Sequence, residues 1–162
     1  YVSIAGAGRP AWEIALEQHE KIYKSQLTAQ EFAETERIVS EWREGRMVPN
    51  PALPIEFVNG IFNLSGQPYL ISWYRYDPAK EIAKLKIPIL IIYAMNDLQV
   101  PKKDAEILAK ANPEAKFKLI GNMNHALKEV LSKSEKSALY SNPNLPLNGE
   151  LVHEIVKFLK QI

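Results

Sequence analysis

Residues 87–101, IPILIIYAMNDLQVP, decide the fold. The stretch begins as a continuous apolar and largely β-branched run, which is typical of a strand buried on both faces of a parallel sheet. Asp97 lies among the polar residues that follow, in the loop at the carboxyl end of that strand. Open parallel sheets place their functional groups at this end. The stretch therefore predicts an α/β fold and a position for its site.

Strand and helix patterns alternate on both sides of this stretch. A second apolar strand, KFKLI, covers 116–120, and helix patterns cover 102–111 and about 148–159. The apolar residues at 2–5 predict a further buried strand. Strand and helix in alternation are the signature of an α/β fold. We expect a mostly parallel sheet of about three strands.

Residues 9–76 contain no strand pattern and predict a helical insertion. Apolar spacing predicts a helix over 11–23, and a capping box of Thr28 and Glu31 opens a second helix that runs to about Gly45. A third short helix is predicted over 57–62 and an aromatic-rich fourth over 65–76. The predicted organisation is a core strand at 1–8, a helical segment at 9–76 and an α/β core at 77–162.

Composition excludes several classes of protein. The 162 residues carry 20 Lys and Arg against 19 Asp and Glu, without a basic run, so nothing indicates a nucleic-acid partner. The chain has no cysteine, which excludes disulfides and thiolate metal sites. No apolar run approaches the roughly 20 residues that a membrane span needs. A small-molecule substrate or a protein is the expected partner, and no cofactor is expected.

Three Asp residues are candidates for an acid. Asp77 precedes Pro78 and is explained as a helix cap, and Asp104 lies in the first turn of a helix, where a carboxylate favours the dipole. Asp97 neither caps a helix nor lies in the first turn of one, which makes it the candidate acid.

Three His residues are candidates for a base. His19 and His153 lie inside helix patterns and are interpreted as structural or surface residues. His125 lies in GNMNHALKE, after the strand at 116–120 and 28 residues after Asp97. Two loops at one sheet edge can bring Asp97 against His125, where the carboxylate would fix the imidazole tautomer and the other ring nitrogen would take a proton from a nucleophile. The alternative is that Asp97 caps the helix after Pro101 and His125 packs in a turn.

The sequence resembles a known family over nearly the whole chain. IPILIIYAMNDLQVP at 87–101, followed by DAEILAKANPEAKFKLIGNMNHALKE, resembles the segment of the α/β-hydrolase family that carries the acid and histidine of the catalytic triad. VSIAGAGRP at 2–10 is similar to the strand before that family's helical lid, and YLISWYRYDP at 69–78 to the return of the lid. The resemblance implies that Asp97 is the orienting acid and His125 the general base.

One departure bears on activity. The family's nucleophile elbow, G-x-S-x-G, occurs nowhere in the sequence. Seven of the serines lie in other contexts: Ser3 lies in a strand, Ser65 and Ser72 lie in the helical segment, and Ser132, Ser134, Ser137 and Ser141 lie in a polar stretch. The resemblance thus implies a carboxyl-terminal half of a serine hydrolase that acts on carboxylic esters or related acyl bonds through an acyl-enzyme, and whose nucleophile is a serine outside this chain. Such a chain alone is expected to be inactive.

The loop at 2–12, VSIAGAGRPAW, formally matches the dinucleotide pattern through Gly6, Gly8 and Ala11. Pro10 removes a donor from that loop, and the acidic second strand that the motif needs is replaced by helix at 25–45. The glycines are interpreted as letting the strand turn sharply.

The aromatic residues of the helical segment and the two asparagines beside His125 each allow two interpretations. Seven aromatic residues in the helical segment are expected mainly to pack a core, with an acyl pocket as the second possibility: Trp12, Trp42, Phe57, Phe62, Tyr69, Trp73 and Tyr74. Asn122 and Asn124 are expected to form turns, with support of the histidine as the second possibility.

A missing amino-terminal half is an expected partner, because the strand at 2–5 would otherwise have a bare edge through which the chain could self-associate. The alternative function is a ligand- or partner-binding module with a vestigial Asp97 and His125 pair.

Overall fold

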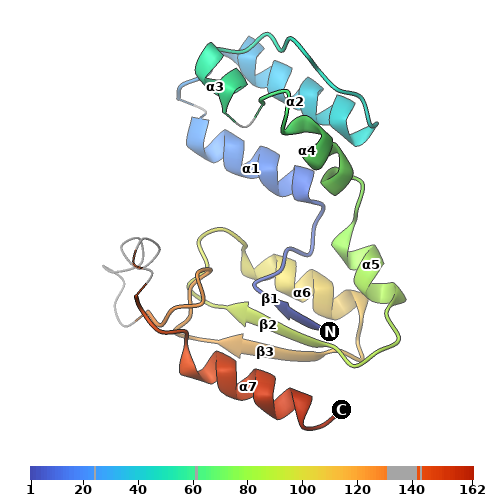
Figure 1. The fold of residues 1–162 in the computed structure, drawn as a ribbon, viewed down its shortest axis with the longest axis vertical. Helices are drawn as coiled ribbons and strands as arrows, with labels where there is room; N and C mark the ends of the chain where they lie inside the picture. Colours follow the sequence, from blue (N-terminus) through green and yellow to red (C-terminus); the bar gives the residue numbers. More distant parts are fainter. Residues whose placement is uncertain (24, 61, 131–141, 143) are drawn as a thin grey trace. The chain divides into compact units, whose positions relative to one another are not determined.

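The computed structural model describes residues 1–23, 25–60, 62–130, 142 and 144–162 (Figure 1). The chain divides into two compact units. The α/β unit comprises Tyr1–Gly8 and Pro78–Ile162, and the helical unit comprises Arg9–Asp77. Ser132, Ser134, Ser137 and Ser141 lie outside the described residues.

The described strands form one parallel sheet. Its strands are β1 (Val2–Ile4), β2 (Leu90–Ala94) and β3 (Lys116–Ile120), in the order β1-β2-β3. Val2 pairs with Leu90, and Leu90 pairs with Lys116. The predicted α/β fold with a three-stranded parallel sheet is confirmed, and β1 is an edge of this sheet.

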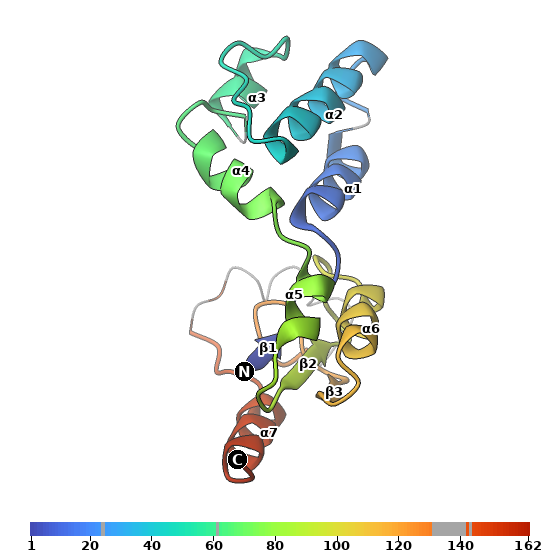
Figure 2. The ribbon, with the colours of Figure 1, turned by 90° about the vertical axis from the view of Figure 1, so that its right-hand side faces the viewer.

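Helices cover both faces of the sheet, with α6 (Lys102–Ala111) on one side and α7 (Gly149–Leu159) on the other (Figures 1 and 2). Alternate residues of β2 belong to two cores. One core contains Leu90, Ile92, Ala94, Leu151 and Phe158, and the other contains Ile82 of α5 (Pro78–Lys84), Ile89, Ile91 and Leu108. Burial on both faces explains why β2 is apolar at successive positions.

The loop after β1 is shaped by a close approach to α6. A Cβ atom on Gly8 would lie 2.0 Å from the backbone oxygen of Asp104, so only glycine fits there. The Gly8 N–H also donates to the buried Asp104 carboxylate at 3.0 Å. Within this loop, the residue in left-handed conformation is Ala5, with φ 49°. Gly8 therefore serves close packing rather than left-handed geometry, and this N–H faces a carboxylate, which disfavours a phosphate site.

The described residues of the helical unit form four helices: α1 (Ala11–Tyr23), α2 (Ala29–Arg43), α3 (Ile55–Asn59) and α4 (Gln67–Tyr74). The capping box is confirmed, because the Glu31 N–H donates to the Thr28 hydroxyl at 3.2 Å and the Thr28 N–H donates to the Glu31 carboxylate at 2.8 Å. The third helix was predicted too late in the chain. It begins directly after Pro54, which lacks an N–H to pair, and it ends before Gly60.

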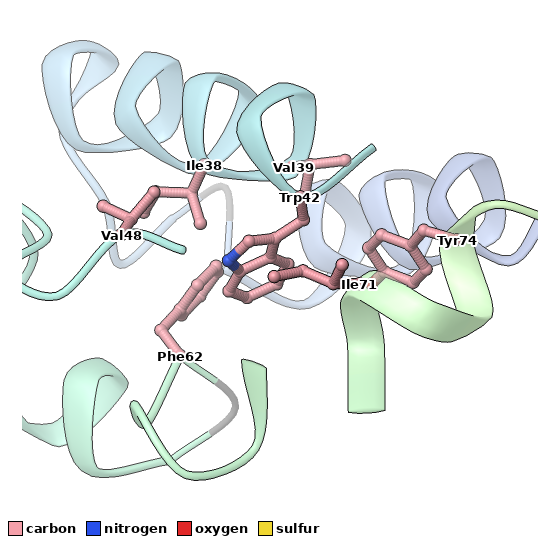
Figure 3. Close-up of a cluster of buried hydrophobic side chains, with 7 residues drawn as sticks. All are labelled: Ile38, Val39, Trp42, Val48, Phe62, Ile71 and Tyr74. Carbon is pink, nitrogen blue, oxygen red and sulfur yellow. The ribbon is translucent and has the colours of Figure 1, made fainter. Parts of the chain in front are cut away.

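Trp42 lies in the core of the helical unit. Figure 3 shows its indole among Ile38, Val39, Val48, Phe62, Ile71 and Tyr74, all of them buried. Gln67 is buried beside it and accepts from the indole N–H at 3.2 Å and from the Val48 N–H at 2.7 Å. Its amide nitrogen donates to the carbonyls of Val48 and Phe62 at 2.8 and 3.2 Å. Every hydrogen-bonding group of this buried amide is thus used.

Within the described ranges, no helix combines the length and the apolar character that crossing a bilayer requires.

Candidate functional site

Two loops meet at the carboxyl ends of β2 and β3. The Met95 N–H donates to the Ile120 carbonyl, which extends the ladder beyond β2. Asn96 then ties the loops together, because its N–H donates to the Met123 carbonyl at 3.0 Å and its side chain donates to the Gly121 carbonyl at 2.7 Å. Sequence reasoning passed over Asn96, although an amide directly before Asp97 was the available signal.

The joined loops bring Asp97 and His125 into contact. Nδ1 of His125 lies 2.8 Å from Oδ2 of Asp97, whose side chain is fully buried. Oδ1 of Asp97 accepts the N–H groups of Gln99 and Val100 at 2.8 and 2.9 Å. Three hydrogen bonds therefore compensate the burial of this carboxylate and fix its orientation.

The alternative in which Asp97 caps the following helix is not what the structure shows. The residue at the N-cap of α6 is Pro101, and no side chain caps this helix. Asp97 instead closes the turn that leads to Val100 and keeps its second oxygen for the imidazole.

A tight turn holds the backbone of His125. The Leu127 N–H donates to the Asn124 carbonyl at 3.0 Å, and Leu127 is left-handed with φ 63°. The buried Asn124 side chain accepts the Lys128 N–H at 2.9 Å. Asn124 thus forms the turn that presents His125, as the sequence predicted for this residue.

Asn122 connects the same turn to α7. Its amide nitrogen donates to Glu129 at 2.6 Å, and its oxygen accepts from Asn148 at 3.1 Å. Asn148 caps α7 by accepting the Leu151 N–H at 3.2 Å. The loop that carries His125 is therefore hydrogen-bonded to the amino-terminal end of α7, which packs against the sheet.

The environment of His125 favours its charged form. The hydrogen bond to Asp97 raises the pKa of His125 above 6.5, partial burial opposes this, and the charge of Asp97 adds to the rise. With Nδ1 facing the carboxylate, the neutral imidazole carries its proton on Nδ1 and its lone pair on Nε2. The side chain is 33% exposed, so it combines a fixed orientation with access.

The other candidate residues lie elsewhere. His19 is buried in the helical unit and His153 is exposed on α7. Lys102 pairs with Glu106 on the surface of α6 at 2.7 Å. In the part of the chain that the structure describes, no cluster of three or more His, Asp or Glu residues could hold a metal ion.

The aromatic residues divide between the core and the surface. Trp42, Phe62 and Tyr74 belong to the buried core, against which Trp12 and Phe57 pack. Tyr69 and Trp73 are 65% and 49% exposed on α4, with ring centroids 5.8 Å apart.

Comparison with known proteins finds likeness in structure only. No family model matches the chain, and no curated protein matches it. Rv0554 from Mycobacterium tuberculosis resembles 99% of this chain with a TM-score of 0.45 and 14% identity. BpoC of strain H37Rv, a candidate non-heme bromoperoxidase, resembles 99% with a TM-score of 0.46 and 15% identity. This chain spans 56% and 57% of their lengths, and likeness of this size assigns no activity.

Proposed function

We propose that this chain supplies the acid and the base of a serine hydrolase of the α/β-hydrolase family, acting on carboxylic esters or related acyl bonds. One observation carries the proposal: a fully buried Asp97, fixed by two backbone N–H groups, binds Nδ1 of a partly exposed His125 at 2.8 Å. This is the arrangement that a serine nucleophile needs in a histidine base.

The chemistry follows from the tautomer. Nε2 of His125 takes the proton of the serine hydroxyl as that oxygen attacks the acyl carbon, and Asp97 stabilises the imidazolium that forms. The imidazolium then donates its proton to the leaving alcohol. Water repeats the sequence on the acyl-enzyme, with His125 again as the base.

The serine in this proposal lies outside the 162 residues, since the sequence contains no G-x-S-x-G elbow. The helical unit would be the lid that shapes the acyl site. Its exposed Tyr69 and Trp73 on α4 are apolar surface suited to contact an acyl chain.

Active-site labelling tests the proposal. The purified protein is treated with a fluorophosphonate and the intact masses are measured. We expect no adduct on the 18.4 kDa chain and one label on the larger or separate chain that carries the serine. In the protein that also carries the serine, Asp97→Asn is expected to lower kcat for a p-nitrophenyl ester by about 10⁴, because it removes the carboxylate that sets the tautomer.

His153→Gln on the exposed face of α7 is the matched control and should leave both labelling and hydrolysis unchanged. A label on the 18.4 kDa chain itself would place the nucleophile within these residues and refute the external serine. If no chain is labelled, and Asp97→Asn leaves any hydrolysis unchanged, the hydrolase proposal is wrong and a binding module is favoured.

A further inference from the structure

His19 is the most unusual buried group in the helical unit. Its side chain lies on α1, and only 6% of the residue is exposed. Within the described part of the chain, neither ring nitrogen has a hydrogen-bond partner. Buried polar groups are nearly always paired, so an imidazole with two unpaired nitrogens requires an explanation.

Four aromatic rings enclose this imidazole. They come from α1, α2, α3 and the segment before α4, with ring centroids at 4.7 Å for Tyr23, 6.2 Å for Phe32, 6.1 Å for Phe57 and 5.6 Å for Phe62. His19 therefore lies where α1 meets the amino-terminal half of α2 and the short α3. No ring in this enclosure offers a strong acceptor for an N–H of a charged imidazole, apart from the Tyr23 hydroxyl, which is both donor and acceptor.

Two of the described carboxylates line cavities beside these rings. Glu20 of α1 lines a cavity of about 370 Å³ with Phe32, and Glu56 of α3 lines one of about 320 Å³ with Tyr23 and Phe57. Both carboxylates are exposed. Glu31 of α2 is held in the capping box by Thr28.

We propose that His19 makes the closure of α1 against α2 and α3 sensitive to pH, because its imidazole can be enclosed by these rings only while it is neutral. Protonation adds a charge and a second N–H donor, and neither has a partner inside the enclosure. The imidazolium is more stable when the rings move apart, because water and the carboxylates of Glu20 and Glu56 can then reach it. The proposal does not depend on the role of His125.

The direction of the pH dependence follows from linkage. Burial lowers the pKa of His19 below 6.5 in the closed form, while the open form titrates near the ordinary value. The closed form is therefore fully favoured above about pH 6.5. Below that pH the open form binds the additional proton, and the equilibrium constant for opening rises by up to tenfold per pH unit until His19 in the closed form also titrates.

Amide hydrogen exchange on the intact chain tests this proposal. Protection of α1, α2 and α3 is compared at each pH between 7.5 and 5 in the native protein and in His19→Phe, which keeps an aromatic ring but cannot titrate. The intrinsic pH dependence of exchange cancels in this comparison. We expect the ratio of native to variant opening to rise by up to tenfold per pH unit below about 6.5.

His153→Phe on α7 is the control and should keep the pH dependence of the native protein. A ratio of native to His19→Phe opening that stays constant from pH 7.5 to 5 would overturn the proposal. If His19→Phe does not fold, NMR titration of the His19 ring in the native chain decides: a pKa well below 6.5 supports the proposal, and a value at or above 6.5 refutes it.

Discussion

The two oxygens of Asp97 serve different partners. Oδ1 accepts two backbone N–H groups of its own turn, and Oδ2 accepts from the imidazole of His125. Because the first pair of hydrogen bonds fixes the carboxylate, the second determines which nitrogen of His125 carries the proton. The proton transfer proposed for His125 therefore depends on one oxygen of Asp97 fixing the carboxylate while the other sets the tautomer of the imidazole.

Asp97→Asn should invert the pKa shift of His125. In the native chain the hydrogen bond and the charge of Asp97 raise the pKa of His125 above 6.5, while burial lowers it. The variant removes the charge and weakens the hydrogen bond, so burial dominates and the pKa should fall below 6.5. NMR titration of the His125 ring measures the change.

Glu129→Gln is the control for this titration, because Glu129 lies in the same loop and accepts a hydrogen bond from the Asn122 side chain. It should leave the pKa of His125 above 6.5. An unchanged pKa in Asp97→Asn would mean that the pair is not electrostatically coupled, which is the vestigial arrangement.

At the scale of elements, single residues join segments that are distant in the sequence. Gly8 lies against the backbone of Asp104 in α6, and Gln67 of α4 binds Val48 and Trp42. In both places one side chain, or its absence, determines how closely two segments approach.

Gly8→Ala should destabilise the α/β unit. The new Cβ would lie 2.0 Å from the backbone oxygen of Asp104, so the loop or α6 must move, at a cost of about 1–3 kcal/mol in the free energy of unfolding. Hydrogen exchange of the β2 amides measures the loss. Gly121→Ala is the matched control: its Cβ would meet no atom within 4 Å, and the change should stay within about 0.5 kcal/mol.

Gln67→Leu should destabilise the helical unit by at least about 3 kcal/mol. Leucine has a similar size but leaves the Trp42 indole N–H and the Val48 N–H and carbonyl buried without partners, each costing about 1–3 kcal/mol. Urea unfolding followed by tryptophan fluorescence measures the change. Ser72→Ala, on the exposed face of the same helix, should change the free energy by less than about 0.5 kcal/mol; an equal loss in both variants would contradict the role of Gln67.

These elements show what the sequence could predict. The apolar run at 87–93, the capping box of Thr28 and the loop positions of Asp97 and His125 are local patterns, and each predicted its element directly. The contacts of Gly8, Gln67 and Asn96 join segments that are distant in the sequence. No local pattern of apolar and polar residues therefore predicts them. The third helix was placed too late because Pro54, rather than the first aromatic residue, starts it.

At the scale of the whole molecule, the chain contains separate hydrophobic cores. Among the described residues, the core around Trp42 is built from residues of the helical unit, and the two cores of the sheet from residues of the α/β unit. Each unit thus has the apolar core that independent stability requires. The chain therefore need not unfold as one cooperative block.

Two unfolding transitions are the expected result. All three tryptophans, Trp12, Trp42 and Trp73, lie in the helical unit, so tryptophan fluorescence reports that unit alone, while the ring signal of His125 reports the α/β unit. In urea the two probes should give different midpoints. Gln67→Leu should lower only the fluorescence midpoint and Gly8→Ala only that of His125, because each variant weakens one core. If both probes move together in both variants, the two cores unfold as one cooperative system.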